Sequence, residues 1–364
     1  MTPSTDSNVK KFLNSIELPG IARTIGDVGR VLEYSDADGR IRAQIELGFA
    51  ATGAHASYRE AVISAIATQT DCDDVEIEFS TRIVAHGVQH NLKPLEQIRN
   101  VIAVASGKGG VGKSTVAVNL ALALAADGAS VGMLDADIYG PSQPHMLGIA
   151  GEQPVSIDGK SMQPLQAHGI QVMSIGFLVD PDQAMVWRGP MVTSALNQLL
   201  TQTTWHDLDY LIVDMPPGTG DIQLTLTQQV PVSGAVIVTT PQDIALLDAR
   251  KGLTMFRKVS VPVLGVIENM STHVCSECGH EESIFGSGGG QQMASDFDIE
   301  LLGQLPLDGA IRQQTDSGSP TVVSDPESAA ANAYREGARR MSSILAAQSK
   351  DYSSKFPKIV VEDG

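Results

Sequence analysis

The sequence has few cysteines, few aromatic residues and no long hydrophobic run, and each shortage excludes a class of protein. Three cysteines, Cys72, Cys275 and Cys278, are too few for a disulfide framework. Aromatic residues make up 4% of the chain, so the core must be mostly aliphatic. No apolar stretch reaches the roughly 18 residues of a membrane-spanning helix. The polar residues 1–11 lack the apolar segment of a secretory signal, so we expect a cytoplasmic protein.

Basic residues are also scarce, because 25 lysines and arginines face 42 aspartates and glutamates. The resulting net charge of −17 repels the phosphate groups of nucleic acids and of anionic membranes. We therefore expect neither nucleic acid nor membrane to be the main partner.

Changes in the hydrophobic pattern divide the 364 residues into a small domain and a larger one. In the larger domain short, continuous apolar runs alternate with helical segments, which is typical of strands buried on both faces. We therefore expect a doubly wound α/β fold with a mainly parallel sheet, preceded by a small N-terminal α+β domain. The predicted division is a disordered start at 1–11, the small domain at 12–90, a linker at 91–99, the α/β domain at 100–348 and a loose tail at 349–364.

Individual segments support this division. In the small domain, alternation predicts strands at Arg40–Leu47 and Asp74–Ile83, and helical spacing predicts a helix at Tyr58–Thr68. The apolar runs of the larger domain lie at Val101–Ala105, Val131–Leu134, Val172–Ile175, Leu211–Val213, Ala235–Val238, Val263–Ile267 and Leu301–Leu305.

A glycine-rich loop, GKGGVGKST, follows the first apolar run of the larger domain and precedes a helical pattern at Val116–Ala126. It fits the P-loop pattern G-x-x-x-x-G-K-[ST] in the strand–loop–helix context that the pattern requires, which a chance glycine-rich turn would lack. Glycines let backbone N–H groups surround phosphates at the positive end of a helix, while Lys113 reaches the terminal phosphates and Ser114 binds Mg²⁺. The predicted nucleotide-binding residues are Gly107, Lys108, Gly109, Gly110, Val111, Gly112, Lys113, Ser114 and Thr115.

Acidic residues end two of the predicted strands. Asp135 and Asp137 follow one run and Asp214 closes another, so their side chains project from the carboxyl edge of the sheet. Aspartates at such positions often only cap the next helix, but beside a P-loop we assign Asp135 and Asp214, with Ser114, to Mg²⁺. Asp137 is predicted to orient the attacking water. No other base is evident, so hydrolysis would rest on positioning and charge stabilisation.

Lys108 is a second lysine in the loop, and an ordinary P-loop does not need one there. It is either a solvated surface residue or a lysine that reaches the nucleotide of a second subunit and stabilises transition-state charge. We favour the second interpretation, which makes Lys108, Lys113 and Asp137 the predicted catalytic residues of an ATPase.

Cys275 and Cys278 form a C-x-x-C pair, which places two thiolates on one turn. Two thiolates are half of a four-coordinate zinc or iron–sulfur site. The remaining ligands could be His273, His280, Cys72 or the same pair from a second chain, and a redox-active pair without metal is a further alternative. The second chain needs no new residue type, and Lys108 independently calls for one, so we expect a homodimer.

The loop with its extra lysine resembles the deviant P-loop of the MinD/ParA and nitrogenase-iron-protein class. Over about residues 98–345 the sequence is similar to the Mrp family of iron–sulfur cluster carrier ATPases. The runs that carry this resemblance are DADIYGPS at 135–142, WRGPM at 187–191, DMPPGTGD at 214–221, ENMS at 268–271 before the cysteine pair, and IFGSGGG at 284–290.

The resemblance implies an ATP-binding and ATP-hydrolysing carrier that passes iron–sulfur clusters to apoproteins. It also implies a homodimer in which Cys275 and Cys278 of both chains hold a bridging cluster of the [4Fe–4S] type. Asn269 stands where the class uses an asparagine to recognise adenine. Many Mrp proteins carry a cysteine in a loop of the small N-terminal domain, but the equivalent stretch here, Gly48–His55, has none. For this domain we therefore expect a packing or docking role.

Two rival functions remain at this point. An ATPase that targets hydrophobic tail segments also dimerises through a C-x-x-C pair, but around zinc, and it needs a large exposed apolar groove. The insert Phe177–Leu200, with Met185, Trp187 and Met191, is short for that purpose. A partitioning ATPase acting on DNA or membrane would need a basic or amphipathic tail, which the sequence lacks.

Overall fold

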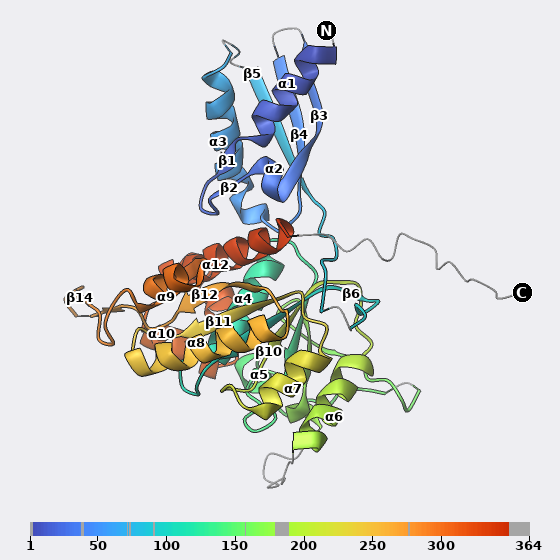
Figure 1. The fold of residues 1–364 in the computed structure, drawn as a ribbon, viewed down its shortest axis with the longest axis vertical. Coiled ribbons are helices and arrows are strands. Elements are labelled where there is room, and N and C mark those ends of the chain that lie inside the picture. The colour runs from blue at the N-terminus through green and yellow to red at the C-terminus, as the bar shows by residue number, and fades with distance from the viewer. Residues whose placement is uncertain are drawn as a thin grey trace, which may run out of the picture.

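Two hydrophobic cores organise the chain, and in the computed structural model they form a small N-terminal domain above a larger one (Figure 1). The predicted tail at 349–364 and the insert residues Met185 and Trp187 lie outside the described residues. The structure describes residues 3–37, 40–70, 72, 74–89, 92–156, 158–178, 189–275 and 277–348.

An eight-stranded sheet forms the centre of the larger domain, in the order β15-β12-β11-β6-β10-β7-β9-β8. Every neighbouring pair is parallel except β8 and β9, which are antiparallel. The predicted doubly wound, mainly parallel fold is confirmed, and each of the seven predicted apolar runs overlaps one of its strands, two of them extending one residue beyond the strand's end. The strands are β6 (Ile98–Ser106), β7 (Val131–Asp135), β8 (Leu165–Ala167), β9 (Ile170–Ser174), β10 (Leu208–Asp214), β11 (Gly234–Thr239), β12 (Val263–Glu268) and β15 (Leu301–Gln304).

Helices cover both faces of this sheet. The chain moves from β6 to β7 in one direction of the strand order and from β10 to β11 in the other, so right-handed crossovers place the two connecting helices on opposite faces. Helix α12 packs against α4 on one face, and α8 packs against α9 on the other (Figure 1). The helices are α4 (Lys113–Ala126), α5 (Gln143–Met146), α6 (Gly189–Thr201), α7 (Asp221–Gln229), α8 (Asp243–Lys258), α9 (Gly289–Phe297), α10 (Gly309–Asp316), α11 (Thr321–Ser324) and α12 (Ala329–Ala346), with the 3₁₀ turn η2 (Ile175–Phe177).

This topology brings the predicted site residues to one edge of the sheet. Parallel strands present their carboxyl ends together, and ligands of open α/β sheets bind where the direction of strand addition reverses. The loop after β6 and the acids that end β7 and β10 all lie at that edge, because β10 pairs with both of the other strands. A short antiparallel hairpin, β13 (His273–Val274) with β14 (Glu281–Glu282), follows β12 on the same side and projects from the domain (Figure 1).

The small domain contains a three-stranded sheet, β3-β4-β5, in which β3 and β4 are antiparallel and β4 and β5 parallel. Residues of β4 alternate between buried and exposed, as the sequence predicted for this segment. Its elements are α1 (Pro3–Asn14), β1 (Glu17–Leu18), β2 (Arg23–Thr24), α2 (Ile25–Val28), β3 (Gly29–Ala37), β4 (Arg40–Leu47), η1 (Thr52–Ala54), α3 (His55–Ala67) and β5 (Asp74–Thr81).

The expected disordered start at residues 1–11 does not hold for residues 3–11, because helix α1 spans Pro3–Asn14. Its early residues are polar, so sequence alone gives no sign of packing, but Leu13 near its end is completely buried in the core of the small domain. Strand β3 was not predicted either. Apolar Val31 and Leu32 are neighbours in it and polar residues follow, so the strand shows no alternating pattern.

The small domain packs on the far ends of α4 and α12. The Asp127 carboxylate, 3% exposed, accepts two hydrogen bonds from Arg339 at 2.6 and 2.9 Å and one from the Gly53 N–H at 2.9 Å. Ala346 of α12 belongs to the core of the small domain. Residues 49–51 of the loop that usually carries a cysteine in Mrp proteins are completely buried here.

Candidate functional site

The loop between β6 and α4 has a backbone that only glycine tolerates well. Gly110 and Gly112 have φ angles of +83° and +81°, in the left-handed region. A Cβ atom at Gly112 would lie 2.3 Å from Nδ2 of Asn269, and one at Gly107 would lie 2.2 Å from the backbone of Asp248 in α8. Among the described residues, no hydrogen bond engages the N–H groups of 108–111. The loop is therefore shaped to offer its N–H groups to an anion at the start of a helix.

Lys113, the first residue of α4, is 6% exposed and turns toward the acids of the neighbouring strands. Its ammonium group pairs with Oδ1 of Asp214 and donates to Oγ of Ser114 at 3.1 Å. Asp214 is completely buried, so this pairing compensates a charge that would otherwise be costly inside the protein. The structure thus brings together three residues that the sequence assigned to phosphate and Mg²⁺.

Asp135 lies directly opposite Asp214 on the adjacent strand β7 and is also completely buried. Its carboxylate accepts hydrogen bonds from the backbone of Asp137 and Gln143 and from Oγ of Ser174, at 3.1 to 3.2 Å. Burial, with the nearby charge of Asp214, raises the pKa of Asp135 to about 7. Two carboxylates side by side beside a hydroxyl are the oxygen donors that Mg²⁺ prefers, so these residues fit the predicted metal.

Asp137 follows two residues later and is half-buried. Burial raises its pKa, whereas the charge of Lys113 acts in the opposite direction, so the carboxyl group lies within electrostatic reach of that ammonium. Its backbone C=O accepts from Gly140 at 3.3 Å within the turn that follows β7. The structure therefore brings Asp137 to the site, and its role in orienting water stays a prediction.

Lys108 and Asn269 lie on the two flanks of the loop. Lys108 is half-exposed, its backbone C=O accepts from Oγ of Ser106 at 2.9 Å, and its ammonium group makes no hydrogen bond or ion pair with the described residues. Asn269 is 6% exposed, and its Nδ2 donates to the C=O of Val111 at 2.9 Å. Its amide therefore supports the loop directly, and the predicted contact with adenine stays a prediction. Thr115 lies in the first turn of α4, where its C=O accepts from Asn119 at 2.9 Å.

The cysteine pair lies on the hairpin of β13 and β14, with Cys275 half-buried and Cys278 exposed. The Cys275 N–H donates to the C=O of His280, and the Gly279 N–H donates to the C=O of Cys275, both at 2.9 Å. The turn between the cysteines is thus closed by backbone hydrogen bonds. Backbone N–H groups of Glu277 and Cys278 lower the pKa of the Cys275 thiol, which favours the thiolate that a metal binds.

Few contacts fix this hairpin to the domain. His273 Nδ1 lies 3.0 Å from the C=O of Leu307, and the Leu307 N–H donates to Thr272 at 2.7 Å. Just before it, the buried Glu268 accepts from Ser271 Oγ at 2.9 Å and from the backbone of Gly290 at 2.5 Å. The end of β12 is therefore rigid, while the cysteine turn beyond it faces solvent.

Other ligands for the cysteines are missing from the described part of this chain. No group of three or more histidine, cysteine, aspartate or glutamate residues there could hold a metal ion. The third cysteine, Cys72, packs at the margin of the core of the small domain. Completion of the site by the pair of a second chain stays a prediction.

Sequence analysis missed two residues of the nucleotide site, Gln143 and Ser174. Both are completely buried and bind the strand-terminal acids. Gln143 immediately follows the run DADIYGPS, but no residue pattern marks a glutamine as part of a metal site. Ser174 ends β9 and pairs with Asp135 of β7 in the sheet. Knowledge of that strand pairing would have identified Ser174, but the sequence alone does not give it.

Comparisons with known proteins agree with this geometry. A profile of the family described as NUBPL iron-transfer P-loop NTPase matches residues 97–342. The iron–sulfur cluster carrier protein of Haemophilus influenzae is 49% identical over 345 residues, which covers 95% of this chain and 93% of that protein. The carrier protein of Escherichia coli K12 is 52% identical, with coverages of 85% and 84%. The iron–sulfur cluster transfer protein NUBPL of Mus musculus is 55% identical over 256 residues, with coverages of 70% and 80%.

Solved structures show the same fold. A nucleotide-binding protein of Archaeoglobus fulgidus in complex with ADP is 39% identical and superposes with a TM-score of 0.56, over 62% of this chain and 88% of that one. The cell division ATPase MinD of Pyrococcus furiosus, 24% identical, has a TM-score of 0.51 over 66% and 98% of the two chains. None of the helices in the described ranges is long and apolar enough to cross a membrane. The profile spans most of the chain and the relatives align over most of their length, so the chain belongs to the NUBPL iron-transfer P-loop NTPase family.

Proposed function

We propose that this chain is an ATP-dependent carrier that binds an iron–sulfur cluster between two copies of itself and transfers it to apoproteins. The observation that carries the proposal is the C-x-x-C hairpin, which presents two cysteines at the surface and finds no further ligand among the described residues. A site with two thiolates per chain is completed by the same pair from a second chain, which would make it a four-thiolate site. The printed names of the relatives support iron–sulfur clusters as the cargo.

The nucleotide site supports ATP hydrolysis as the energy source. Ser114, Asp135 and Asp214 would hold Mg²⁺, which neutralises charge on the phosphates during hydrolysis. The loop N–H groups and Lys113 would bind the phosphates, and Asp137 would orient the attacking water. Lys108, whose ammonium is uncommitted to any described residue, would reach the nucleotide of the partner copy and stabilise transition-state charge there.

Exposed apolar side chains support the second copy. Large apolar residues that remain exposed in a folded chain often mark an interaction surface when they gather on one face. Several exposed apolar residues lie on the segments that follow the carboxyl ends of β7, β11 and β12, the edge that also carries the nucleotide loop and the cysteine hairpin. They are Tyr139, Ile244, Leu247 and Val274.

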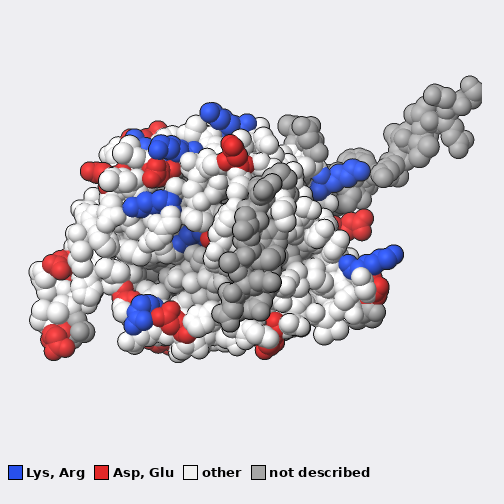
Figure 2. Space-filling view, turned by 90° about the horizontal axis from the view of Figure 1, so that it is seen from below, with Lys and Arg blue, Asp and Glu red and all other residues white. Residues whose placement is uncertain are grey.

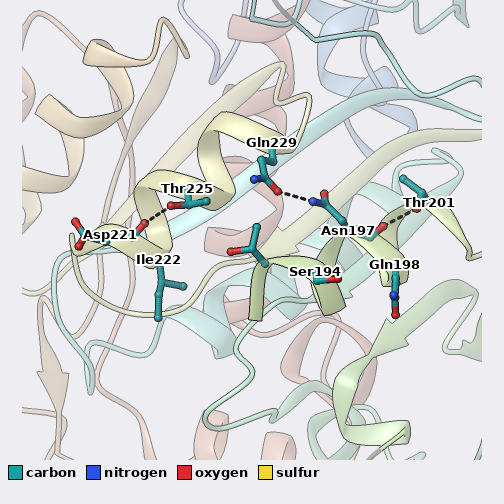
Figure 3. Close-up of a pocket in the computed structure, with 9 residues that line it drawn as sticks. Ser194, Asn197, Gln198, Thr201, Asp221, Ile222, Thr225 and Gln229 are labelled. Atoms are coloured by element: carbon teal, nitrogen blue, oxygen red, sulfur yellow. Dashed lines mark hydrogen bonds between the residues drawn. The ribbon is translucent and has the colours of Figure 1, made fainter. Parts of the chain in front are cut away.

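The rival function, targeting of hydrophobic tails, needs a large apolar groove, and a groove lies between α6 and α7. It has a volume of about 740 Å³ and is open to solvent, and most of its described lining residues are polar, although the surface that they expose is more apolar than polar (Figure 3). Asn197 donates to Gln229 across it, and Thr225 donates to the backbone of Asp221. Apart from Asp221 and Ile222 the described lining residues are uncharged and polar: Thr193, Ser194, Asn197, Gln198, Thr201, Thr225 and Gln229.

The surface charge and the thiols bear on two further expectations, the absence of a nucleic-acid or membrane partner and the cytoplasmic location. On the described part of the face in Figure 2, lysine and arginine side chains are interspersed with acidic ones, which offers no support for a phosphate-rich partner. We place the carrier in the cytoplasm because thiolates that must bind and release a cluster need a reducing compartment.

Reconstitution with iron and sulfide tests the proposal. Anaerobically treated protein should gain about four irons per dimer, with a matching amount of sulfide, and should then activate an apoenzyme that requires a [4Fe–4S] cluster. Cys275→Ser and Cys278→Ser should lose the cluster and the transfer while retaining ATP binding. Cys72→Ser is the matched control and should behave as wild type. A protein that holds only zinc, or serine variants that still transfer clusters, would contradict the proposal.

A further inference from the structure

Gln143 occupies a central place in the nucleotide site. It is the first residue of the short helix α5, eight residues beyond Asp135, and it is completely buried. A buried glutamine is unusual unless its amide is hydrogen-bonded, so its partners indicate what it does.

Three hydrogen bonds join Gln143 to all three residues that we assign to Mg²⁺. Its backbone N–H donates to Oδ2 of Asp135 at 3.1 Å. Its side-chain Nε2 donates to Oδ2 of Asp214 at 2.9 Å and to the backbone C=O of Ser114 at 3.1 Å. One residue therefore fixes the relative positions of two strand ends and of the first turn of α4.

These bonds oppose an electrostatic repulsion. Asp135 and Asp214 are opposite each other on β7 and β10 and both are completely buried, so their charges repel in a region of low dielectric constant. Lys113 pairs with Oδ1 of Asp214, and Gln143 binds the other oxygen of the same carboxylate. A lysine that also has to bind phosphates is a poor fixed restraint, whereas the amide nitrogen of Gln143 is committed to Asp214 and Ser114.

The other end of the Gln143 side chain has no partner. Its Oε1 is buried and makes no hydrogen bond with the described residues, and the same is true of Oγ of the neighbouring Ser142. The Gln143 oxygen belongs to an amide whose nitrogen binds Asp214, so it is an acceptor placed for a water molecule, such as those that Mg²⁺ keeps in its shell.

We propose that Gln143 is a positioning residue of the magnesium–nucleotide site. Its two N–H groups hold Asp135, Asp214 and Ser114 at the spacing that the metal needs, and its Oε1 accepts from the metal's water shell. The same bonds secure the far end of the 136–142 turn that carries Asp137, while the Ala136 N–H, bonded to the C=O of Asp214 at 2.9 Å, secures the near end. This inference rests on the magnesium–nucleotide part of the proposed function and is independent of the cluster.

Binding of ADP to the full-length chain, measured by calorimetry with excess Mg²⁺ and with EDTA, tests this role. The ratio of the two affinities gives the contribution of the metal. Gln143→Met keeps the volume but removes the amide, and it should lower that ratio by about 10–100-fold, as expected when a residue that orients metal ligands is lost. Affinity for ADP in EDTA should change little, because the loop N–H groups are intact.

A second variant and a control separate positioning from folding. Gln143→Asn keeps an amide that is too short to reach both Ser114 and Asp214, so an intermediate loss is expected. Gln171→Met is the matched control, because Gln171 is another buried glutamine of this sheet, with two hydrogen bonds at 2.9 Å to the backbone of His206. Its ratio should stay at the wild-type value.

Three results would overturn the proposal. They are an unchanged ratio in both Gln143 variants, equal losses of affinity with and without Mg²⁺, and a wild-type protein whose ADP affinity does not respond to Mg²⁺. The last result would also remove the magnesium site from the proposed function. If the ratio of ADP affinities with Mg²⁺ and with EDTA changes as expected but cluster transfer fails, only the carrier function is contradicted.

Discussion

The nucleotide site and the cysteine hairpin lie on the same edge of one sheet, yet they are built in opposite ways. Asp135 and Asp214 are completely buried at the ends of β7 and β10, Gln143 is completely buried at the start of α5, and each is held by several hydrogen bonds. Cys275 and Cys278 lie on a hairpin of two-residue strands, half-buried and exposed. One chain is therefore sufficient to place the acids and the glutamine of the first site, whereas the second, in the proposed function, needs the cysteine pair of a partner copy.

This difference suits the two proposed tasks. A nucleotide site must hold charges in fixed positions, and burial with full hydrogen bonding achieves that. A site that passes its cargo to another protein must be reachable and must release what it binds. Dependence on two chains provides a route to release, because any change in the relation between the copies alters the cluster site.

The largest effect should come from Lys113→Ala, which acts only on the buried site. Loss of the ammonium removes charge stabilisation of the phosphates, and loss of one such group typically costs about 10²–10³-fold in turnover. It also leaves the buried Asp214 without its ion partner, and breaking such a pair costs about 3–5 kcal/mol of stability. ATPase assays and thermal unfolding measure the two effects.

The exposed Lys251, paired with Asp248 at 2.9 Å on the surface of α8, provides the control. Lys251→Ala should leave turnover unchanged and shift stability by less than about 1 kcal/mol. Cluster content of the Lys113 variant should stay near the wild-type value. Wild-type turnover in that variant would contradict the assignment of the loop.

Substitution of Lys108, which is proposed to reach the nucleotide of the partner copy, should give the next largest effect. Lys108→Ala should bind ATP but hydrolyse it slowly, because charge stabilisation is lost. Asp137→Ala should also bind ATP and hydrolyse it slowly, because the attacking water is no longer oriented. In mixed dimers one site combines the intact Lys108 and Asp137, so mixing the two variants should restore part of the activity. Absence of rescue, when labelled subunits demonstrably exchange, would exclude action of Lys108 across the dimer.

The sequence predicted most of the larger domain because its signals are local. Continuous apolar runs mark strands that are buried on both faces, and the loop pattern combines fixed spacing with a strand before it and a helix after it. Asp135 and Asp214 were found for the same reason, because each directly ends an apolar run. The sheet then confirms them as neighbours.

The sequence did not predict contacts between segments that are distant in the chain. Gln143 was missed because its importance comes from the adjacency of β7 and β10, which no local pattern encodes. The support that the Asn269 amide gives to the loop at Val111 was not predicted either, because this contact spans more than 150 residues; its predicted contact with adenine stays a prediction. Helix α1 was missed because its first residues are polar, and its apolar residues Val9, Phe12 and Leu13 meet their partners only in the folded core of the small domain.

Two adjacent arginines of α12 should separate the stability of the whole chain from the function of either site. Arg339 pairs with the buried Asp127 at the end of α4 remote from Lys113, about 20 Å away along a 14-residue helix. Arg339→Ala should lower the free energy of unfolding by about 3–5 kcal/mol, because it leaves a buried carboxylate unpaired. Arg340, bonded to the backbone of Gly20 at 2.7 Å, is more exposed, so Arg340→Ala should cost about 1 kcal/mol.

Denaturant unfolding compares the two variants, and both should retain ADP binding and cluster content at temperatures where they are folded. Similar stabilities for the two would show that the Asp127 pair contributes little. A loss of the cluster in folded Arg339→Ala protein would show that the small domain acts on the hairpin, and that the two regions are less independent than their structures indicate.

The last effect is a pH dependence that arises in the buried site. Burial, reinforced by Asp214, raises the pKa of Asp135 from 3.8 to about 7. The folded chain therefore binds a proton that the unfolded chain has already lost between about pH 4 and pH 7, so without nucleotide and metal the free energy of unfolding should fall as pH rises through this window. Mg²⁺ needs the ionised carboxylate, so the contribution of the metal to ADP affinity should rise over the same window. Calorimetry at pH 6, 7 and 8 measures the affinities, and Asp135→Asn should remove both trends. If the metal contribution is the same at all three pH values in the wild type, Asp135 is ionised throughout and the repulsion between the two buried acids has been overestimated.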